Sequence, residues 1–371
     1  MADPGSQPLA VTPLAVTWFM LPGQRPFREL HWLTLMPGAE VTAVGTPRPP
    51  ERARFVERRY RQPTHRFVEA GALAWLRGLD SVAIPPGWLV SLELCSLVTG
   101  QVSALARHRR QLQAVLVWAN DPAMPLYRLP PYRQALRRAR GADLFICLVE
   151  AAREHCVALG LPPERCPVVL PGVDTELFRP AAAPQSEPVA LFVSPLAGNK
   201  GIDRVLEAQR LVRRRLPEAR LEVLGRGPLE GLVRREADRP GSGVSYLGSG
   251  DRHRVAEALR RAAVLVTAPR PTPVWNEQFG IVYIEAMASG LPVVTTVCGS
   301  NHEAVRPPNP RVPDDAEALA EALLGFLADP ARRATVGASN RRSVLERHDL
   351  RRQCARLGEV LRAFGTNSGC P

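Results

Sequence analysis

The sequence predicts an α/β fold made of two Rossmann-like halves joined by a short linker. Short apolar runs rich in β-branched residues alternate with longer amphipathic segments along the chain, as in parallel sheets covered by helices. The length of 371 residues is enough for two domains with separate cores. Residues 179–188 lack any apolar period, and a new strand pattern begins directly after them.

In the first half, apolar runs predict strands at residues 14–20, 40–45, 114–118, 143–149 and 167–170. Amphipathic stretches predict helices at residues 89–111 and 131–140. The segment 46–66 is rich in arginine and proline and has no clear period, so no element is predicted there.

In the second half, the predicted strands cover residues 189–194, 221–224, 264–268 and 293–296. Helices are predicted at residues 202–215, 252–262 and 281–289, with further helices from residue 315 onward. The predicted organisation is an N-terminal domain, a linker, a second domain and a C-terminal helical segment: 1–178, 179–188, 189–345 and 346–371.

The composition excludes several classes of protein. Apolar residues make up 45% and charged residues 23% of the chain, which is typical of a globular domain. No apolar run approaches the roughly 18–20 residues of a membrane span, and no basic segment precedes the apolar stretch 14–21, so a signal peptide is not expected. The seven cysteines form no C-x-x-C pair and the histidines form no metal-binding spacing. We therefore expect reduced thiols, a cytoplasmic location and no metal site.

The net charge of +12 leaves three kinds of anionic partner open: nucleic acid, a membrane surface and a small ligand. Solvated helix faces are the simpler explanation, because many arginines recur at helical spacing. No basic motif interleaved with aromatic residues occurs, so nucleic acid is not expected as a partner, while peripheral membrane association stays open. Lys200 is the only lysine among the 48 basic residues.

Three segments of the second half point to one ligand chemistry. Lys200 ends a glycine-bearing loop between a predicted strand and helix, where free backbone N–H groups favour a phosphate. The segment 225–228, Gly-Arg-Gly-Pro, is a second turn at a strand end. Glu277 and Glu285 are eight residues apart and flank the predicted start of a helix. A diphosphate on the N–H groups of residues 280–282, with a sugar hydroxyl near Glu277 and a ribose near Glu285, fits this layout.

These segments resemble the donor site of glycosyltransferase family 4. The E-x7-E element lies within W-N-E-Q-F-G-I-V-Y-I-E-A-M-A-S-G-L-P-V-V, and the resemblance extends from about residue 142 to 327. It includes residues 170–180, Lys200-Gly201, the turn 225–228 and the loop 299–303. Neither half has the G-x-G-x-x-G pattern of dinucleotide-binding redox enzymes.

The resemblance implies a GT-B-like fold, with two Rossmann-like domains facing across a cleft and a last helix, 351–364, crossing back to the first domain. It implies a retaining hexosyltransferase that moves a sugar from a nucleotide-diphosphate donor to a hydroxyl acceptor. The family's front-face substitution needs no obligatory divalent metal, so neither a metal nor a cofactor is expected.

Residue by residue, the resemblance implies catalytic roles for two residues, Lys200 at the donor diphosphate and Glu277 at the transferred sugar. Glu285 would bind the ribose, and the remaining donor-binding residues would be Gly201, Arg226, Phe279, Gly280, Ile281 and Val282. On the acceptor side the corresponding residues are Gly23, Asn120 and Asp121. The alternative interpretation of Asp121 is a structural one, as a turn residue or helix cap.

The chain departs from the family at one donor position. The family has an arginine about five residues before the lysine, and this chain has Ser194-Pro195-Leu196 there. Our hypothesis is that Arg226 or another arginine replaces that charge. The departure also leaves an alternative function open, a donor-binding pseudoenzyme or partner subunit without turnover. The donor base, the sugar, the acceptor and the oligomeric state are not determined by the sequence.

Overall fold

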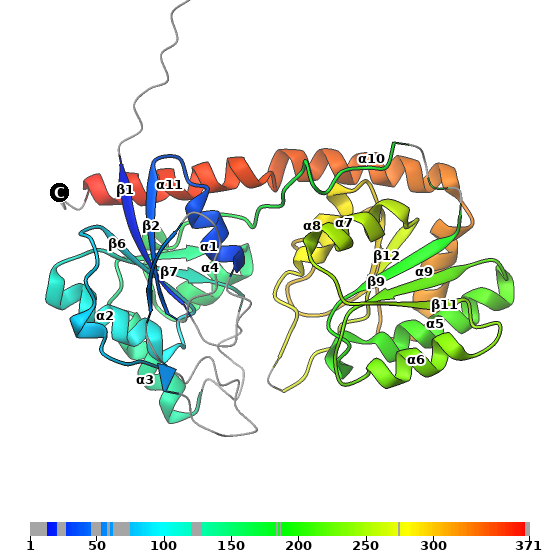
Figure 1. The fold of residues 1–371 in the computed structure, drawn as a ribbon, viewed down its shortest axis with the longest axis horizontal. Helices are drawn as coiled ribbons and strands as arrows, with labels where there is room; N and C mark the ends of the chain where they lie inside the picture. The colour runs from blue at the N-terminus through cyan, green and yellow to red at the C-terminus, as the bar shows by residue number, and fades with distance from the viewer. Residues whose placement is uncertain are drawn as a thin grey trace, which may run out of the picture. The chain divides into compact units, whose positions relative to one another are not determined.

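The computed structural model describes residues 13–20, 27–45, 53–57, 60–61, 75–119, 128–182, 185, 187–273 and 275–367. The chain forms two compact units (Figure 1). Unit 1 contains Met1–Leu148, Ala152–Val169 and Arg351–Pro371, and unit 2 contains Val149–Ala151 and Leu170–Leu350. The segment 179–188, predicted to be a linker, therefore lies within unit 2, and residues 351–371 belong to unit 1.

Unit 1 is built on a parallel sheet with the strand order β3-β2-β1-β6-β7-β8. Its strands are β1 (Leu14–Phe19), β2 (Ala39–Gly45), β3 (Arg54–Glu57), β6 (Trp88–Leu92), β7 (Gln113–Val117) and β8 (Leu144–Cys147). A short antiparallel pair is formed by β4 (Tyr60–Arg61) and β5 (Trp75–Leu76). The helices are α1 (Phe27–Thr34), α2 (Leu97–Arg109), α3 (Pro130–Ala139), α4 (Glu150–Ala158) and α11 (Leu350–Asn367). The first two residues of α4 and the first residue of α11 belong to unit 2. On unit 1, α11 brings the ring of Phe364 to 6.0 Å from that of Trp88.

Unit 2 is built on a second parallel sheet, with the order β11-β10-β9-β12-β13-β14. Its strands are β9 (Val189–Val193), β10 (Arg220–Leu224), β11 (Val244–Gly248), β12 (Val264–Val266), β13 (Val293–Thr296) and β14 (Arg311–Val312). Its helices are α5 (Ile202–Arg215), α6 (Glu230–Asp238), α7 (Arg252–Arg261), α8 (Ile281–Ala288), α9 (Ala316–Leu327) and α10 (Pro330–Arg347). Helices α5 and α6 cover one face of the sheet and α7 and α8 the other (Figure 1), as right-handed crossovers require.

The strand order of unit 2 reverses between β9 and β12. Beginning at β9, the chain adds β10 and β11 on one side, and then returns to add β12, β13 and β14 on the other. In doubly wound sheets the ligand binds outside the carboxyl ends of the strands at this point of reversal. The loops that follow β9 and β12 contain Lys200 and Glu277, respectively.

The predicted α/β class and most predicted elements are confirmed, and α5 and β13 have the predicted bounds. The helix predicted at 89–111 was wrong in its first part, because Trp88–Leu92 forms the central strand β6 and α2 begins only at Leu97. All five residues of β6 are buried. A strand covered on both faces is a continuous apolar run, which has no period of its own to distinguish it from a buried helix.

The strand predicted at 167–170 was also wrong. Only Val168 pairs with β8, through a single bridge to Cys147. Pro167 has no N–H group to contribute to a longer ladder. Among the helices that the structure describes, none combines the length and the apolarity that crossing a membrane requires.

Candidate functional site

Gly201 brings the start of α5 against the end of β12. Its φ of +69° is left-handed, and a Cβ at this position would lie 1.7 Å from the backbone oxygen of Ala268. Only glycine combines that backbone conformation with so close an approach. The preceding turn, Gly198–Lys200, lies beside the loop that follows β12, because the N–H of Arg270 donates to the backbone oxygen of Asn199 over 3.0 Å. Gly201 is also the N-cap of α5, and no side chain caps that helix.

Lys200 and Glu277 meet at this point, although 77 positions separate them in the sequence. Nζ of Lys200 donates a hydrogen bond to Oε2 of Glu277 over 2.7 Å, and the two side chains are 20% and 14% exposed. The ammonium also lies 4.1 Å from the centre of the Trp275 ring. The structure thus brings together the two predicted catalytic residues, next to the reversal point of the sheet.

The backbone of Glu277 is held by the loop that follows β13. The N–H of Ser300 donates to the backbone oxygen of Glu277 over 2.9 Å. Gly299 has a φ of +51°, and a Cβ there would lie 2.3 Å from the same oxygen. The buried side chain of Asn301 closes the loop by donating to the backbone oxygen of Thr296 over 2.8 Å. This loop positions the carboxylate through backbone contacts.

Helix α8 begins directly after the Glu-Gln-Phe-Gly segment. Its N-cap is Gly280, with a φ of +80° and no capping side chain. The first turn of a helix leaves N–H groups without partners inside the helix, so this end can bind an anion. Phe279 and Ile281 are buried, whereas Val282 and Glu285 are half-buried. The predicted site residues at and before the start of α8 therefore divide into buried residues and residues that solvent reaches.

The second glycine turn packs against the loop that follows β9. A Cβ on Gly225 would lie 2.0 Å from the backbone oxygen of Ser194, and the N–H of Leu196 donates to the backbone oxygen of Arg226 over 2.9 Å. The exposed Arg226 thus starts beside residues 194–196, where the family resemblance implies an arginine.

The junction between α10 and α11 contacts the site residue Phe279 through His348. The ring of His348 is 5.6 Å from that of Phe279, and its Nδ1 lies 2.9 Å from the backbone oxygen of Pro171. His348 is 3% exposed, and burial lowers the pKa of its imidazole from 6.5 to about 4. The histidine is therefore neutral near pH 7, and Nδ1 is the nitrogen that donates to Pro171.

This lowered pKa predicts a loss of stability in weak acid. The unfolded chain binds a proton at His348 near pH 6.5, whereas the folded chain binds one only near pH 4. The contribution is complete above pH 6.5 and is lost as the pH falls to about 4, with a total of up to about 3 kcal/mol. We expect His348→Asn, whose amide can still donate to Pro171, to reduce the slope of unfolding free energy against pH in this window. Equal slopes in both proteins would contradict the prediction.

The three residues predicted on the acceptor side, Gly23, Asn120 and Asp121, lie outside the described residues.

The structure also shows residues that the sequence did not indicate. Trp275 is one of them, and only its position two residues before Glu277 could have signalled it. Glu93 is another, with a φ of +67° just after β6, beside the reversal point of the unit 1 sheet. A non-glycine residue in this conformation is uncommon and concentrates at functional sites.

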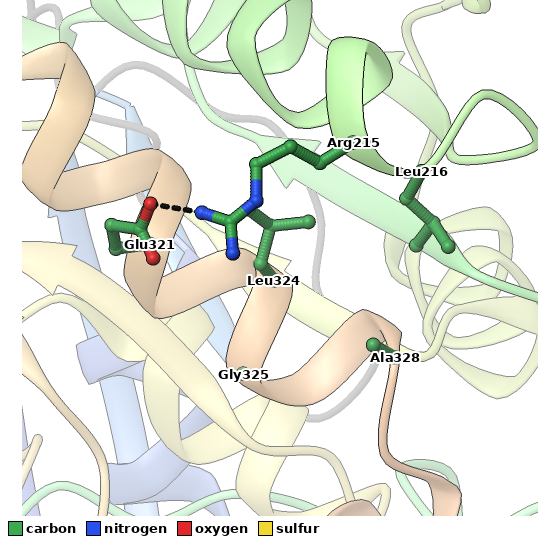
Figure 2. Close-up of a pocket in the computed structure, with 6 residues that line it drawn as sticks. All are labelled: Arg215, Leu216, Glu321, Leu324, Gly325 and Ala328. Carbon is green, nitrogen blue, oxygen red and sulfur yellow. Dashed lines mark hydrogen bonds and ion pairs between the residues drawn. The ribbon is translucent and has the colours of Figure 1, made fainter.

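A hollow of about 340 Å³ lies elsewhere on unit 2, between the C-terminal end of α5 and α9 (Figure 2). Figure 2 shows the ion pair of Arg215 with Glu321 across it. The 14 residues of α5 separate it from Lys200 by about 21 Å at 1.5 Å per residue. It is therefore not part of the site. Among the described residues, no group of three or more histidine, cysteine or acidic side chains is arranged to hold a metal ion.

Comparison with known proteins gives a family match for most of unit 2. Residues 173–343 match the family model described as "Glycosyl transferases group 1". The chain is 33% identical over 251 residues to the GDP-mannose-dependent alpha-(1-6)-phosphatidylinositol monomannoside mannosyltransferase of Mycolicibacterium smegmatis, covering 63% of this chain and 66% of that protein. It is 32% identical over 252 residues to the D-inositol 3-phosphate glycosyltransferase of Mycobacterium bovis, covering 60% of this chain and 50% of that protein. The chain thus spans between half and two thirds of the length of these relatives.

Solved structures resemble the chain over nearly its whole length. Anabaena Alr3699/HepE in complex with UDP has a TM-score of 0.72 at 17% identity, covering 94% of this chain and 100% of that one. Sucrose-phosphate synthase from Thermosynechococcus elongatus has a TM-score of 0.69 at 19% identity, covering 95% and 100%. At these identities the likeness concerns the fold alone.

Proposed function

Since the chain is glycosyltransferase family 4-like, with a GT-B-like fold of two Rossmann-like domains, we propose that it transfers a hexose from a nucleoside-diphosphate sugar to a hydroxyl acceptor. The observation that carries the proposal is the contact of Lys200 with Glu277 at the reversal point of the unit 2 sheet. A cation, a carboxylate and the N-terminal ends of α5 and α8 meet there. Such groups can bind a diphosphate and a sugar hydroxyl.

The proposed chemistry is transfer with retention by front-face substitution. As the bond between the sugar and the diphosphate breaks, negative charge grows on the diphosphate and positive charge on the sugar ring. Lys200 and the N–H groups at Gly280–Val282 stabilise the first charge, and Glu277 holds the sugar. The leaving phosphate takes the proton of the acceptor hydroxyl, so no further protein base is required.

No metal is part of this proposal, because Lys200 and the α8 N-terminus supply the positive charge at the diphosphate. Turnover measured in EDTA tests this part. A requirement for a divalent ion would show that the charge at Lys200 is insufficient.

GDP-mannose is the first donor to test, because GDP-mannose-dependent mannosyltransferases are among the relatives of this chain. Thermal unfolding with GDP-mannose, UDP-glucose and UDP-N-acetylglucosamine identifies the donor as the compound that stabilises the protein. Product analysis by NMR then shows the anomeric configuration. Binding of a nucleotide sugar without hydrolysis or transfer to any acceptor would favour the pseudoenzyme, and failure of every donor to bind would contradict both functions.

The acceptor that we propose carries an anionic phosphate next to an inositol or mannose hydroxyl. The relatives are named for such acceptors, and the charge of the chain is uneven. Unit 1 has 24 arginines against 13 acidic residues, whereas unit 2 has 24 basic against 23 acidic residues. On unit 1, α3 contains Arg133, Arg137 and Arg138 and no acidic residue, and the neighbouring Leu129 is 49% exposed.

This charge distribution also supports peripheral membrane association through unit 1. We expect the protein to cosediment with vesicles containing phosphatidylinositol and to remain in solution with vesicles of phosphatidylcholine alone. Binding should weaken as salt is raised, since anionic headgroups attract arginines through a screened interaction. Equal binding to both vesicles, or to neither, would contradict membrane association.

Arg226→Ala tests whether this arginine replaces the one missing at residues 194–196. We expect donor affinity to fall about tenfold, the effect of losing one exposed charge-assisted hydrogen bond. The measurement is donor binding by calorimetry together with donor KM. Arg235→Ala, an arginine of α6 outside the site, is the control. Unchanged affinity and rate in the Arg226 variant would exclude it from the donor site.

A further inference from the structure

Lys200 has an aromatic neighbour in addition to Glu277. Its Nζ lies 2.7 Å from Oε2 of Glu277 and 4.1 Å from the centre of the Trp275 ring. A cation within about 6 Å of a tryptophan ring is attracted to the face of the ring. We infer that Trp275 is a positioning residue for Lys200, which keeps the ammonium in place while a diphosphate replaces Glu277 as its anionic partner. This inference rests on the proposed function.

The backbone holds Trp275 independently of Lys200. The N–H of Thr272 donates to the backbone oxygen of Trp275 over 2.8 Å, and the N–H of Trp275 donates back over 3.3 Å. Pro273 stands within this turn and restricts its backbone further. The ring is thus attached to a closed turn, whereas the lysine side chain is a flexible stem with several rotatable bonds. A tryptophan side chain has only two rotatable bonds, so Trp275 is the less flexible of the two partners.

Lys200 and Glu277 balance each other's charge. Lys200 and Glu277 are each largely withdrawn from water, at 20% and 14% exposure, so either charge alone would be poorly solvated. An arriving diphosphate brings a greater negative charge than one carboxylate and competes for the same ammonium. Glu277 is then free to accept a hydrogen bond from the transferred sugar.

The ring matters most during this exchange. An ammonium group has three N–H donors. Its attraction to an aromatic face does not take up any of these donors completely, so they stay available for oxygen acceptors. Lys200 can therefore turn from the carboxylate to a phosphate oxygen while it remains on the Trp275 ring. Without the ring, the lysine would have to be ordered again when the donor binds, and donor affinity would be lower.

The single lysine of this chain makes the inference directly measurable. Protein grown with ¹³C-labelled lysine gives NMR signals from Lys200 alone. Protons over the face of an indole ring are shifted upfield by the ring current, so we expect upfield Hε signals in the wild type. Trp275→Leu should return these signals to the position of a solvated lysine, and Trp275→Phe should keep part of the shift.

Titration with inorganic pyrophosphate and with GDP tests the exchange of partners. We expect the Lys200 signals to move as either probe binds, with the dissociation constant of GDP raised about 3- to 10-fold in Trp275→Leu. Trp275→Phe, the matched control that keeps an aromatic face, should lie near the wild type. In turnover, the loss should fall mainly on donor KM and less on kcat.

Each result decides one part of the inference. Hε signals at the solvated position in the wild type would overturn it, and this measurement needs no variant to fold. Equal shifts and equal GDP affinity in the wild type and a folded Trp275→Leu protein would also overturn it. An upfield shift with no response to pyrophosphate, GDP or any nucleotide sugar would overturn the proposed function and the exchange, while the placement of Lys200 by Trp275 would stand.

Discussion

Replacing Lys200 by alanine is expected to lower kcat by about 10²–10³-fold, the usual effect of removing one donor that stabilises charge in a transition state. The ammonium is the cation that the structure places on Glu277, beside the N-cap of α5. Its removal also leaves that carboxylate unpaired at 14% exposure. The measurement is kcat and KM with the donor identified by the unfolding screen.

Lys200→Arg is the more informative substitution, because it keeps the charge and changes only its shape. The ammonium fits between the Glu277 carboxylate and the Trp275 ring, and a broad planar guanidinium needs more room. We expect kcat to fall by at least about tenfold, a difference in barrier of about 1.4 kcal/mol. Activity near the wild-type level would mean that the only lysine of the chain reflects codon usage.

Arg204→Ala provides a control from the same region. Arg204 lies in the first turn of α5, and its guanidinium pairs with Glu207 and Asp314. Removing this cation changes the net charge as Lys200→Ala does, without touching Glu277. We expect its kcat to stay within about twofold of the wild type, because exposed ion pairs contribute little.

Gly201→Ala is expected to have the largest effect on stability. Its Cβ would lie 1.7 Å from the backbone oxygen of Ala268, and its φ of +69° is unfavourable for alanine. The clashing oxygen belongs to the backbone and not to a flexible side chain, so α5 or the end of β12 must shift. We expect the free energy of unfolding of unit 2 to fall by more than about 2 kcal/mol.

Two other glycines separate the causes of this loss. A Cβ at Gly198 would have nothing within 4 Å, so Gly198→Ala should change stability by less than about 0.5 kcal/mol. Gly241 has a φ of +74° and also has open space around it, so Gly241→Ala should cost about 1 kcal/mol for the backbone conformation alone. Denaturant unfolding of the three variants measures all these values. A Gly201→Ala protein no less stable than Gly241→Ala would show that the close approach to Ala268 is absent.

The predicted elements of unit 2 agree with the structure more closely than those of unit 1. Helix α5 has one apolar face that packs on the sheet, with Ile202, Val205 and Val212 buried. The sequence shows this face as an apolar repeat at helical spacing. The strand β6 is buried on both faces and has no such period, so its residues were assigned to a helix. Periodicity reports one-sided burial and therefore fails at the centre of a sheet.

The candidate site was also predictable only in part. The types of residue at Lys200, Glu277, Gly280 and Glu285, and their spacing along the chain, predict a site for a diphosphate and a sugar, and the structure brings Lys200 and Glu277 together. The contact of Lys200 with Trp275 was not predictable, because it depends on a turn of the loop after β12. The left-handed Glu93 gave no signal in the sequence, since no local pattern requires a glutamate to adopt that conformation.

By itself, the sequence determined the alternation of strands and helices, the glycines at the helix starts and the residue types of the candidate site, because each of these depends on neighbours along the chain. The tertiary structure alone decided that β9 lies beside β12, so that Lys200 and Glu277 meet across 77 positions. Strand order arises from the crossovers and from the packing of whole helices on a sheet. No local pattern of residues encodes this order, and so the ion pair at the centre of the site became visible only in the folded chain.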